Sequence, residues 1–436
     1  MSSKIDRETT LNDSNARASG SYSGRRRVLL SGLGAAAALT LPGISLAQAK
    51  KIPIGLVVGL TGKAGAWGVP VSDAVRLAFD EINVSGGIKS KGGAQLELIV
   101  VDHQSNPQMA GTQTERVIQV DHVLAVIGNV TSGATMVGSA VAEKNKTPML
   151  STDLADALTT RGMTYFFRLG PRISLLGGLT VEYAQAMAKA TGVSPKKVAT
   201  IADDSTFSQD AINGVLKKLK DGPWPLQENV SFAAGQVNDF IPILQRLKLS
   251  GVDALFLATF PADGIQIQRA LKTLNYDLVS EVHVAGAPFA PDFAANLKQD
   301  ANFVSDAVGF VAELTSKNPL LAKFGDAYKA KYGKELDDQT SLAVTVVGTL
   351  YDALERCSSL TRESLTQALR ATDLKQGANP YVLRDGAKFD ANGDNERTRG
   401  LIMQLRDGRQ RIVYPADVAT EKAVWPMPKW SNRKSS

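Results

Sequence analysis

Two hydrophobic patterns alternate along most of the chain. Continuous apolar runs such as Ile52–Leu60 lack polar gaps, which is typical of strands buried on both faces of a sheet. Between these runs, apolar residues recur every three or four positions, as in the predicted helix that contains Ala74 and Ile82. Pro70 suits the first turn of that helix, so residues 62–68 before it are expected to form a loop.

The alternation occurs in two series that are separated near residue 170. Strands are predicted at residues 52–60, 96–102, 123–128 and 147–151, and then at residues 197–203, 252–259 and 281–286. Repeated strand–helix units favour parallel, doubly wound sheets, so we expect an α/β protein with two such lobes. Three further helix patterns follow, and residues 401–415 are expected to form a hairpin that turns at Asp407-Gly408.

The first 49 residues are typical of an export signal. Arg25–Arg27 precede the mildly apolar stretch Val28–Leu46, and Ala47–Ala49 fits an A-x-A cleavage site. The paired arginines favour the twin-arginine route. The glycines and Pro42 argue against a membrane anchor, because a spanning helix needs about 20 strongly apolar residues. The mature protein is therefore expected in the periplasm, beginning near Lys50 and not embedded in a membrane.

Charge and cysteine content narrow the function further. The formal charge of +6 falls to +3 without the predicted signal, which carries six basic and three acidic residues, and so small an excess does not indicate a nucleic-acid partner. Cys357 is the only cysteine and lies in an apolar helix pattern, so we expect a buried thiol.

The C-terminal residues 425–436 are expected to form a surface terminus.

One short stretch, Ala125–Thr135 (AVIGNVTSGAT), has the form of a strand, a loop and a helix start. Ligands of open α/β sheets bind outside the carboxyl ends of the strands, where helix N-termini point inward. Ser132 is expected to cap the helix, and the N–H groups after it can take a carboxylate. A plain helix cap with no ligand remains an alternative interpretation of Ser132.

Six motifs in order carry a family resemblance: IPIGLVVGLTGKAGAWG, FDEINVSGGI, VDHQSNPQMA, VLAVIGNVTSGAT, ALTTRGMTYFFRLGP and KFDANGDN. Together they resemble the leucine/isoleucine/valine-binding type of extracytoplasmic solute receptor that serves ABC transporters. The resemblance implies a type I periplasmic-binding fold, in which three crossovers join two α/β lobes and the ligand lies in the cleft between them. It places the signal at residues 1–49, lobe 1 at 50–169, lobe 2 at 170–309, a return to lobe 1 at 310–379, and a return hairpin with the tail at 380–436.

The resemblance also implies ligand-binding residues. Ser132 and the loop that contains Ser151 and Asp153 match the part of the family site that holds the ligand carboxylate. Trp67 stands where relatives place an aromatic ring over the ligand side chain. Phe207 and Phe260 match two cleft tyrosines of the family, so each lacks the hydroxyl, and packing within the core is the alternative for both.

One departure from the family pattern bears on the ligand. Amino-acid-binding members carry a glutamate that pairs with the ligand ammonium, whereas this chain has Ala287, Pro288 and Phe289 there. A buried ammonium without a counter-charge is costly. Either Asp153 or Asp263 supplies the charge, or the ligand has no ammonium and lies against an apolar wall. That wall would consist of Trp67, Phe207, Phe260 and Phe289.

We therefore expect a non-enzymatic, monomeric substrate-binding protein of an ABC uptake transporter that hands a small carboxylate to permease subunits. His103, His122 and His283 are scattered and form no catalytic or metal motif, so neither a metal nor a cofactor is expected. The stretch Asp390–Glu396 has its glycine in the fourth place, unlike a calcium loop, and is expected to form a turn. A sensory receptor that docks on a signalling partner is the alternative function.

Overall fold

The computed structural model describes residues 50–317 and 319–433. The predicted twin-arginine signal at residues 1–49 lies outside the described residues. Within the described ranges, none of the helices combines the length and apolarity that crossing a membrane requires.

The first sheet has five strands, all parallel, in the order β2-β1-β3-β4-β5. Its strands are β1 Lys51–Val58, β2 Gln95–Asp102, β3 Ala125–Asn129, β4 Met149–Ser151 and β5 Phe166–Arg168. The predicted run at residues 52–60 is buried along most of β1, as expected for a central parallel strand.

The second sheet has seven strands in the order β14-β13-β10-β9-β8-β6-β7. Its strands are β6 Val198–Asp203, β7 Leu226–Phe232, β8 Ala254–Ala258, β9 Ser280–Val284, β10 Ser305–Val308, β13 Leu401–Arg406 and β14 Arg409–Tyr414. Five of them are parallel, and the β13–β14 hairpin adds an antiparallel edge. We call the parts of the chain built on the two sheets the first lobe and the second lobe. The α/β prediction with two parallel-sheet lobes is thereby confirmed.

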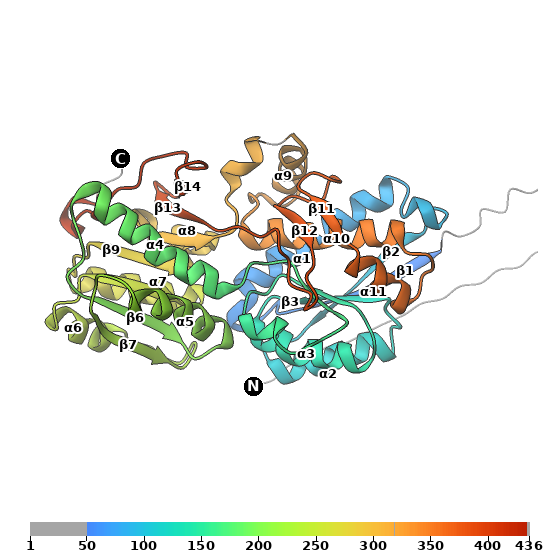
Figure 1. Ribbon diagram of the computed structural model, residues 1–436, viewed down its shortest axis with the longest axis horizontal. Coiled ribbons are helices and arrows are strands. Elements are labelled where there is room, and N and C mark those ends of the chain that lie inside the picture. The colour runs from blue at the N-terminus through green and yellow to red at the C-terminus, as the bar shows by residue number, and fades with distance from the viewer. Residues whose placement is uncertain (1–49, 318, 434–436) are drawn as a thin grey trace, which may run out of the picture. The chain divides into compact units, whose positions relative to one another are not determined.

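Helices connect the strands and flank both sheets (Figure 1). They are α1 Gly65–Val84, α2 Pro107–Gln119, α3 Ser132–Lys144, α4 Ile173–Thr191, α5 Thr206–Lys220, α6 Ile241–Leu249, α7 Pro261–Thr273, α8 Pro291–Leu297, α9 Pro319–Tyr332, α10 Asp338–Arg356 and α11 Arg362–Arg370. Helices α4 and α5 pack together on the second lobe, whereas α10 packs against α1 (Figure 1). A small pair of strands, β11 Asp373–Lys375 and β12 Gly386–Lys388, completes the fold.

Two expectations from the sequence are wrong. Helix α1 begins at Gly65, so Pro70 lies inside the helix and the preceding loop is shorter than predicted. The C-terminal segment is not a bare surface terminus, because Trp425 and Met427 are buried against the second lobe. The indole of Trp425 donates to the Val193 carbonyl at 2.8 Å, and the Met427 N–H donates to the Val279 carbonyl at 2.9 Å. Cys357 is a buried free thiol, as predicted.

Buried ion pairs hold the segment after β12 in place. Asp394 accepts from the fully buried Arg168 at the end of β5 and from Arg172, at 2.6 Å. Arg384 pairs with Asp338, the first residue of α10, at 2.8 Å. Charges removed from water need partners of this kind, so residues 384–394 are tied to two distant parts of the chain.

Candidate functional site

The turn after β3 does not use Ser132 as its helix cap. Helix α3 begins at Ser132, and Thr131 occupies the N-cap position without a side-chain bond to any of the described backbone N–H groups. The Ser132 hydroxyl oxygen instead accepts from the Ala155 N–H at 3.3 Å. The N-cap prediction is therefore wrong, because this hydroxyl joins α3 to the loop after β4. The first turn of α3 keeps the positive end of its dipole without a capping oxygen.

The carboxylate of Asp153 organises the same turn. It accepts from the Asn129 N–H at 3.2 Å, from the Ser151 hydroxyl at 3.0 Å and from the Thr135 hydroxyl. Burial raises the pKa of Asp153, and these three donors and His103 partly offset that effect. Ser151 and Asp153 thus hold the loop of residues 129–132 against the loop after β4.

Two residues of this network, His103 and Thr135, were not among the predicted site residues. His103 follows β2, is fully buried, and binds the Asn129 carbonyl through Nε2 at 2.9 Å. Thr135 lies within the motif that begins at Ala125, but its hydrogen bond to Asp153 depends on the folded position of its hydroxyl and could not be read from the sequence. His103 follows one strand and Asn129 ends another, and strand ends of one parallel sheet meet at a common edge, so this proximity could have been inferred.

The four predicted aromatic residues come together in one cluster. The Trp67 ring, on the first turn of α1, lies 5.5 Å from Phe289 with 15° between the planes, and 5.0 Å from Phe260. Phe207 meets Trp67 edge-on at 6.3 Å and Phe260 at 6.4 Å. We call these residues the aromatic cluster. Such offset and edge-on pairs are favourable beyond the apolar area that they bury.

The aromatic cluster joins elements from both lobes. Trp67 belongs to the first lobe. On the second lobe, Phe207 is the second residue of α5, Phe260 precedes α7, and Phe289 ends the short helix η4, Ala287–Phe289. All four side chains are at most 7% exposed. Three of the second-lobe connections thus present rings to one indole of the first lobe.

Acidic groups flank the cluster on the second lobe. Asp263, on the first turn of α7, is 1% exposed; its Oδ2 accepts from the Gly235 N–H at 3.1 Å, and its Oδ1 has no partner among the described residues. Burial raises the pKa of Asp263, and the charge of Asp203 adds to this while the Lys63 ammonium opposes it. Lys63 comes from the first lobe, and its Nζ lies 5.0 Å from the centre of the Phe260 ring.

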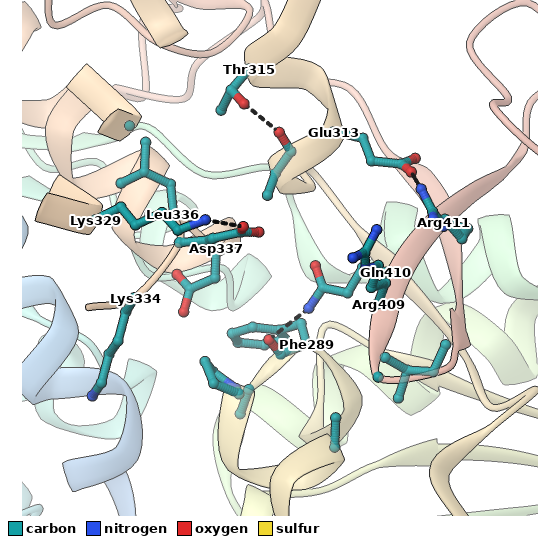
Figure 2. A pocket seen from close by; sticks show the side chains of 18 of the residues that line it. Phe289, Glu313, Thr315, Lys329, Lys334, Leu336, Asp337, Arg409, Gln410 and Arg411 are labelled. Atoms are coloured by element: carbon teal, nitrogen blue, oxygen red, sulfur yellow. Dashed lines mark hydrogen bonds and ion pairs between the residues drawn. The ribbon is translucent and has the colours of Figure 1, made fainter. Parts of the chain in front are cut away.

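A cavity of about 940 Å³ is lined in part by Phe289 (Figure 2). One wall is η4, α8 and the β13–β14 hairpin, and the other is the helical segment η6 Ala312–Lys317, α9 and residues 333–337. Gln410 donates to the Phe289 carbonyl at 2.9 Å, and Arg411 pairs with Glu313 (Figure 2). Of the seven predicted site residues, Phe289 is the one that lines this cavity.

Asp337 gives the cavity a buried carboxylate. It caps α10 by accepting from the Thr340 N–H at 2.8 Å and the Thr340 hydroxyl at 2.7 Å. Burial raises its pKa to about 6, and neighbouring Asp338 adds to this. The charged lining makes this cavity a poor match for an apolar ligand body, so the aromatic cluster and the α3 turn remain the candidate ligand site.

Comparisons with known proteins agree on the family. A family model described as "Periplasmic binding protein" matches residues 51–409. The chain is 27% identical over 382 residues to "Leu/Ile/Val-binding protein homolog 7" of Brucella melitensis, a match that covers 86% of this chain and 94% of that protein.

Two solved structures share the fold. A branched-chain amino acid transporter substrate-binding protein of Streptococcus pneumoniae, in complex with isoleucine, is 25% identical with a TM-score of 0.72, covering 84% of this chain and 100% of that one. A solute-binding protein of R. palustris in complex with benzoate is 18% identical with a TM-score of 0.70, covering 83% and 95%.

Proposed function

Because the chain belongs to the periplasmic-binding protein family, we propose that it captures a small carboxylate with an apolar body and delivers it to the permease of an ABC transporter. The observation that carries this proposal is the aromatic cluster beside an uncapped helix start. Trp67 of the first lobe packs against three phenylalanines of the second lobe. The α3 turn supplies backbone N–H groups that suit a carboxylate.

Lobe closure is the proposed mechanism of capture. A ligand bound against the aromatic cluster, touching Trp67 and the second-lobe rings, contacts both lobes only when they are together. Its binding free energy therefore favours the closed form, and the membrane partner recognises the surface of that form. The proposed lobe boundaries are residues 50–169 with 310–379, and 170–309 with 380–436, which agrees with the packing of α10 on α1 and of β13 on β10.

Ligands named for two similar proteins suggest the ligand class. Isoleucine and benzoate are both carboxylates with apolar bodies, and they differ in the ammonium group. In this chain the three-residue helix η4 stands where the family glutamate would be, and its ring-bearing residue is Phe289. The proposal therefore includes branched-chain or aromatic amino acids and apolar or aromatic acids that lack an ammonium.

A thermal-shift screen tests the proposal. The mature chain from Lys50 is unfolded and refolded to remove co-purified ligand, and is then heated with leucine, isoleucine, valine, phenylalanine, their 2-oxo acids, benzoate and cinnamate. A ligand that binds only the native state raises the melting temperature. If no panel member raises it, the proposed ligand class is wrong. Loss of uptake of the bound compound in a strain without the protein distinguishes transport from the sensory alternative.

A further inference from the structure

The indole N–H of Trp67 differs from those of the other three tryptophans, each of which donates a hydrogen bond. Trp224 donates to the Ser194 hydroxyl at 2.8 Å, Trp425 to the Val193 carbonyl at 2.8 Å, and Trp430 to the Tyr276 carbonyl at 3.0 Å. Trp67 Nε1 alone finds no acceptor anywhere in residues 50–317 and 319–433. These are all four tryptophans of the chain, so the difference is specific to the aromatic cluster.

Burial makes this missing acceptor significant. The Trp67 side chain is 4% exposed, so water does not replace a protein partner. Its nearest rings, those of Phe207, Phe260 and Phe289, carry no polar atom that could accept the hydrogen bond. Buried donors in native proteins are nearly always paired, and an unpaired one calls for an explanation such as a ligand that binds there.

We propose that Trp67 Nε1 donates a hydrogen bond to an oxygen of the bound ligand, which makes Trp67 a specificity-determining residue as well as an apolar wall. This inference rests on the proposed function and deepens it. An indole N–H is only a donor, so the ligand atom beside it must be an acceptor such as a carboxylate, oxo or hydroxyl oxygen. An ammonium offers only donors and would leave both groups unpaired.

The charges around the cluster agree with a ligand that lacks an ammonium. The Lys63 ammonium of the first lobe lies over the ring of Phe260. Phe260 precedes Asp263 by three residues in the chain. A ligand ammonium that approached the spare oxygen of Asp263 would meet this lysine, and like charges repel. The combination favours carboxylates with a second oxygen or a bare aromatic body, such as 2-oxo acids and benzoate-type acids.

The indole signals of the mature protein test the proposal directly. With ¹⁵N-labelled tryptophan, the four Nε1–H resonances are recorded before and after addition of 4-methyl-2-oxopentanoate, phenylpyruvate or benzoate. The expected result is a downfield shift and slower hydrogen exchange at Trp67, while the three indoles that already have partners stay in place. A ligand that binds without moving the Trp67 resonance would overturn the proposal.

Matched variants separate the indole N–H from the ring. Trp67→Phe keeps an aromatic ring and removes the donor, whereas Trp224→Phe removes an indole N–H far from the cluster. Trp67→Phe is expected to weaken binding of the acceptor-bearing ligand roughly 5- to 100-fold, and Trp224→Phe to leave it unchanged. Without ligand, Trp67→Phe loses part of a buried ring but also removes an unpaired buried donor, and these two effects on the melting temperature oppose each other.

The outcomes also distinguish this inference from the proposed function. If the wild type binds a panel member and Trp67→Phe binds it equally well, the proposed function stands and the indole contact is wrong. If the wild type binds leucine but not its 2-oxo acid, the inferred preference for a ligand without an ammonium is wrong. If the wild type binds no panel member, the proposed function fails and this inference fails with it.

Discussion

The ion pair between Arg168 and Asp394 offers a sharp test of how the folded chain is held together. The Arg168 side chain is 0% exposed and that of Asp394 is 10% exposed. In Asp394→Leu the guanidinium stays buried without its anion, and breaking one side of a buried pair costs about 3–5 kcal/mol. Arg168 keeps hydrogen bonds to the Leu154 and Ala155 carbonyls at 2.9 and 2.7 Å, so we expect a loss of about 3 kcal/mol.

The second variant of this test removes both charges. Arg168→Met combined with Asp394→Leu leaves no buried charge, and apolar replacement of a buried pair is often close to neutral. The double variant should therefore be more stable than Asp394→Leu alone, although two carbonyls lose their donor. Urea unfolding followed by circular dichroism measures both variants. Lys388→Met, which breaks an exposed pair in the same segment, is the matched control and should leave the midpoint unchanged.

Two results would contradict this expectation: a cost of Asp394→Leu below about 1 kcal/mol, or a double variant that is less stable than the single one. The first result would mean that Asp156 and water compensate the Arg168 guanidinium, since the Asp156 charge already opposes the lowering of the Arg168 pKa by burial. The second would mean that Arg168 acts mainly through its bonds to the carbonyls of Leu154 and Ala155.

Three further predictions concern single residues. Asp337→Asn keeps an N-cap residue at the start of α10 but removes an ionisable carboxyl. The pKa of Asp337 is about 6 in the native state, above its ordinary value of 3.8. The native state therefore binds the proton more tightly than the unfolded state does, and the stability of the wild type falls as the pH rises from about 4 to about 6. In urea melts, the free energy of unfolding of the variant should thus exceed that of the wild type by up to about 3 kcal/mol at pH 7 and match it near pH 4. A difference between variant and wild type that is the same at both pH values would contradict this. Asp153→Ala removes the acceptor that the Asn129 N–H and the Ser151 and Thr135 hydroxyls share, and should weaken ligand binding at least about tenfold in calorimetry. Unchanged affinity would refute its positioning role. Trp425→Ala should cost about 3 kcal/mol in urea melts, since it empties a buried site on the second lobe, whereas a loss too small to measure would restore the surface-terminus prediction.

Local pattern was enough to predict most of the fold. The predicted strand at residues 96–102 is β2, and the expected turn of the hairpin has positive φ at both Asp407 and Gly408, +48° and +74°. The start of α1 escaped prediction because its glycines resemble a loop. Gly68 is instead required by packing, since a Cβ there would collide with the carbonyl oxygen of Gly59.

Interactions between distant segments were beyond such patterns. Asp394 lies in a polar turn that gives no sign of burial, and its partner Arg168 is 226 residues away in the chain. The C-terminal tail likewise shows few apolar residues, yet Trp425 finds its acceptor in Val193, 232 residues away. The aromatic cluster could be named from the family resemblance, but its mutual contacts are a property of the folded chain.

The α3 turn, which first suggested a ligand site, chiefly binds other parts of its own lobe. Asp153 takes donors from Asn129, Thr135 and Ser151, and the Ser132 oxygen takes the Ala155 N–H, so the acceptors of this turn are engaged. What the first lobe still offers is donors: the N–H groups at the start of α3 and the Trp67 indole. The second lobe offers rings. A ligand that satisfies both has an anionic head toward the first lobe and an apolar body toward the second, which is the chemistry of an apolar carboxylate.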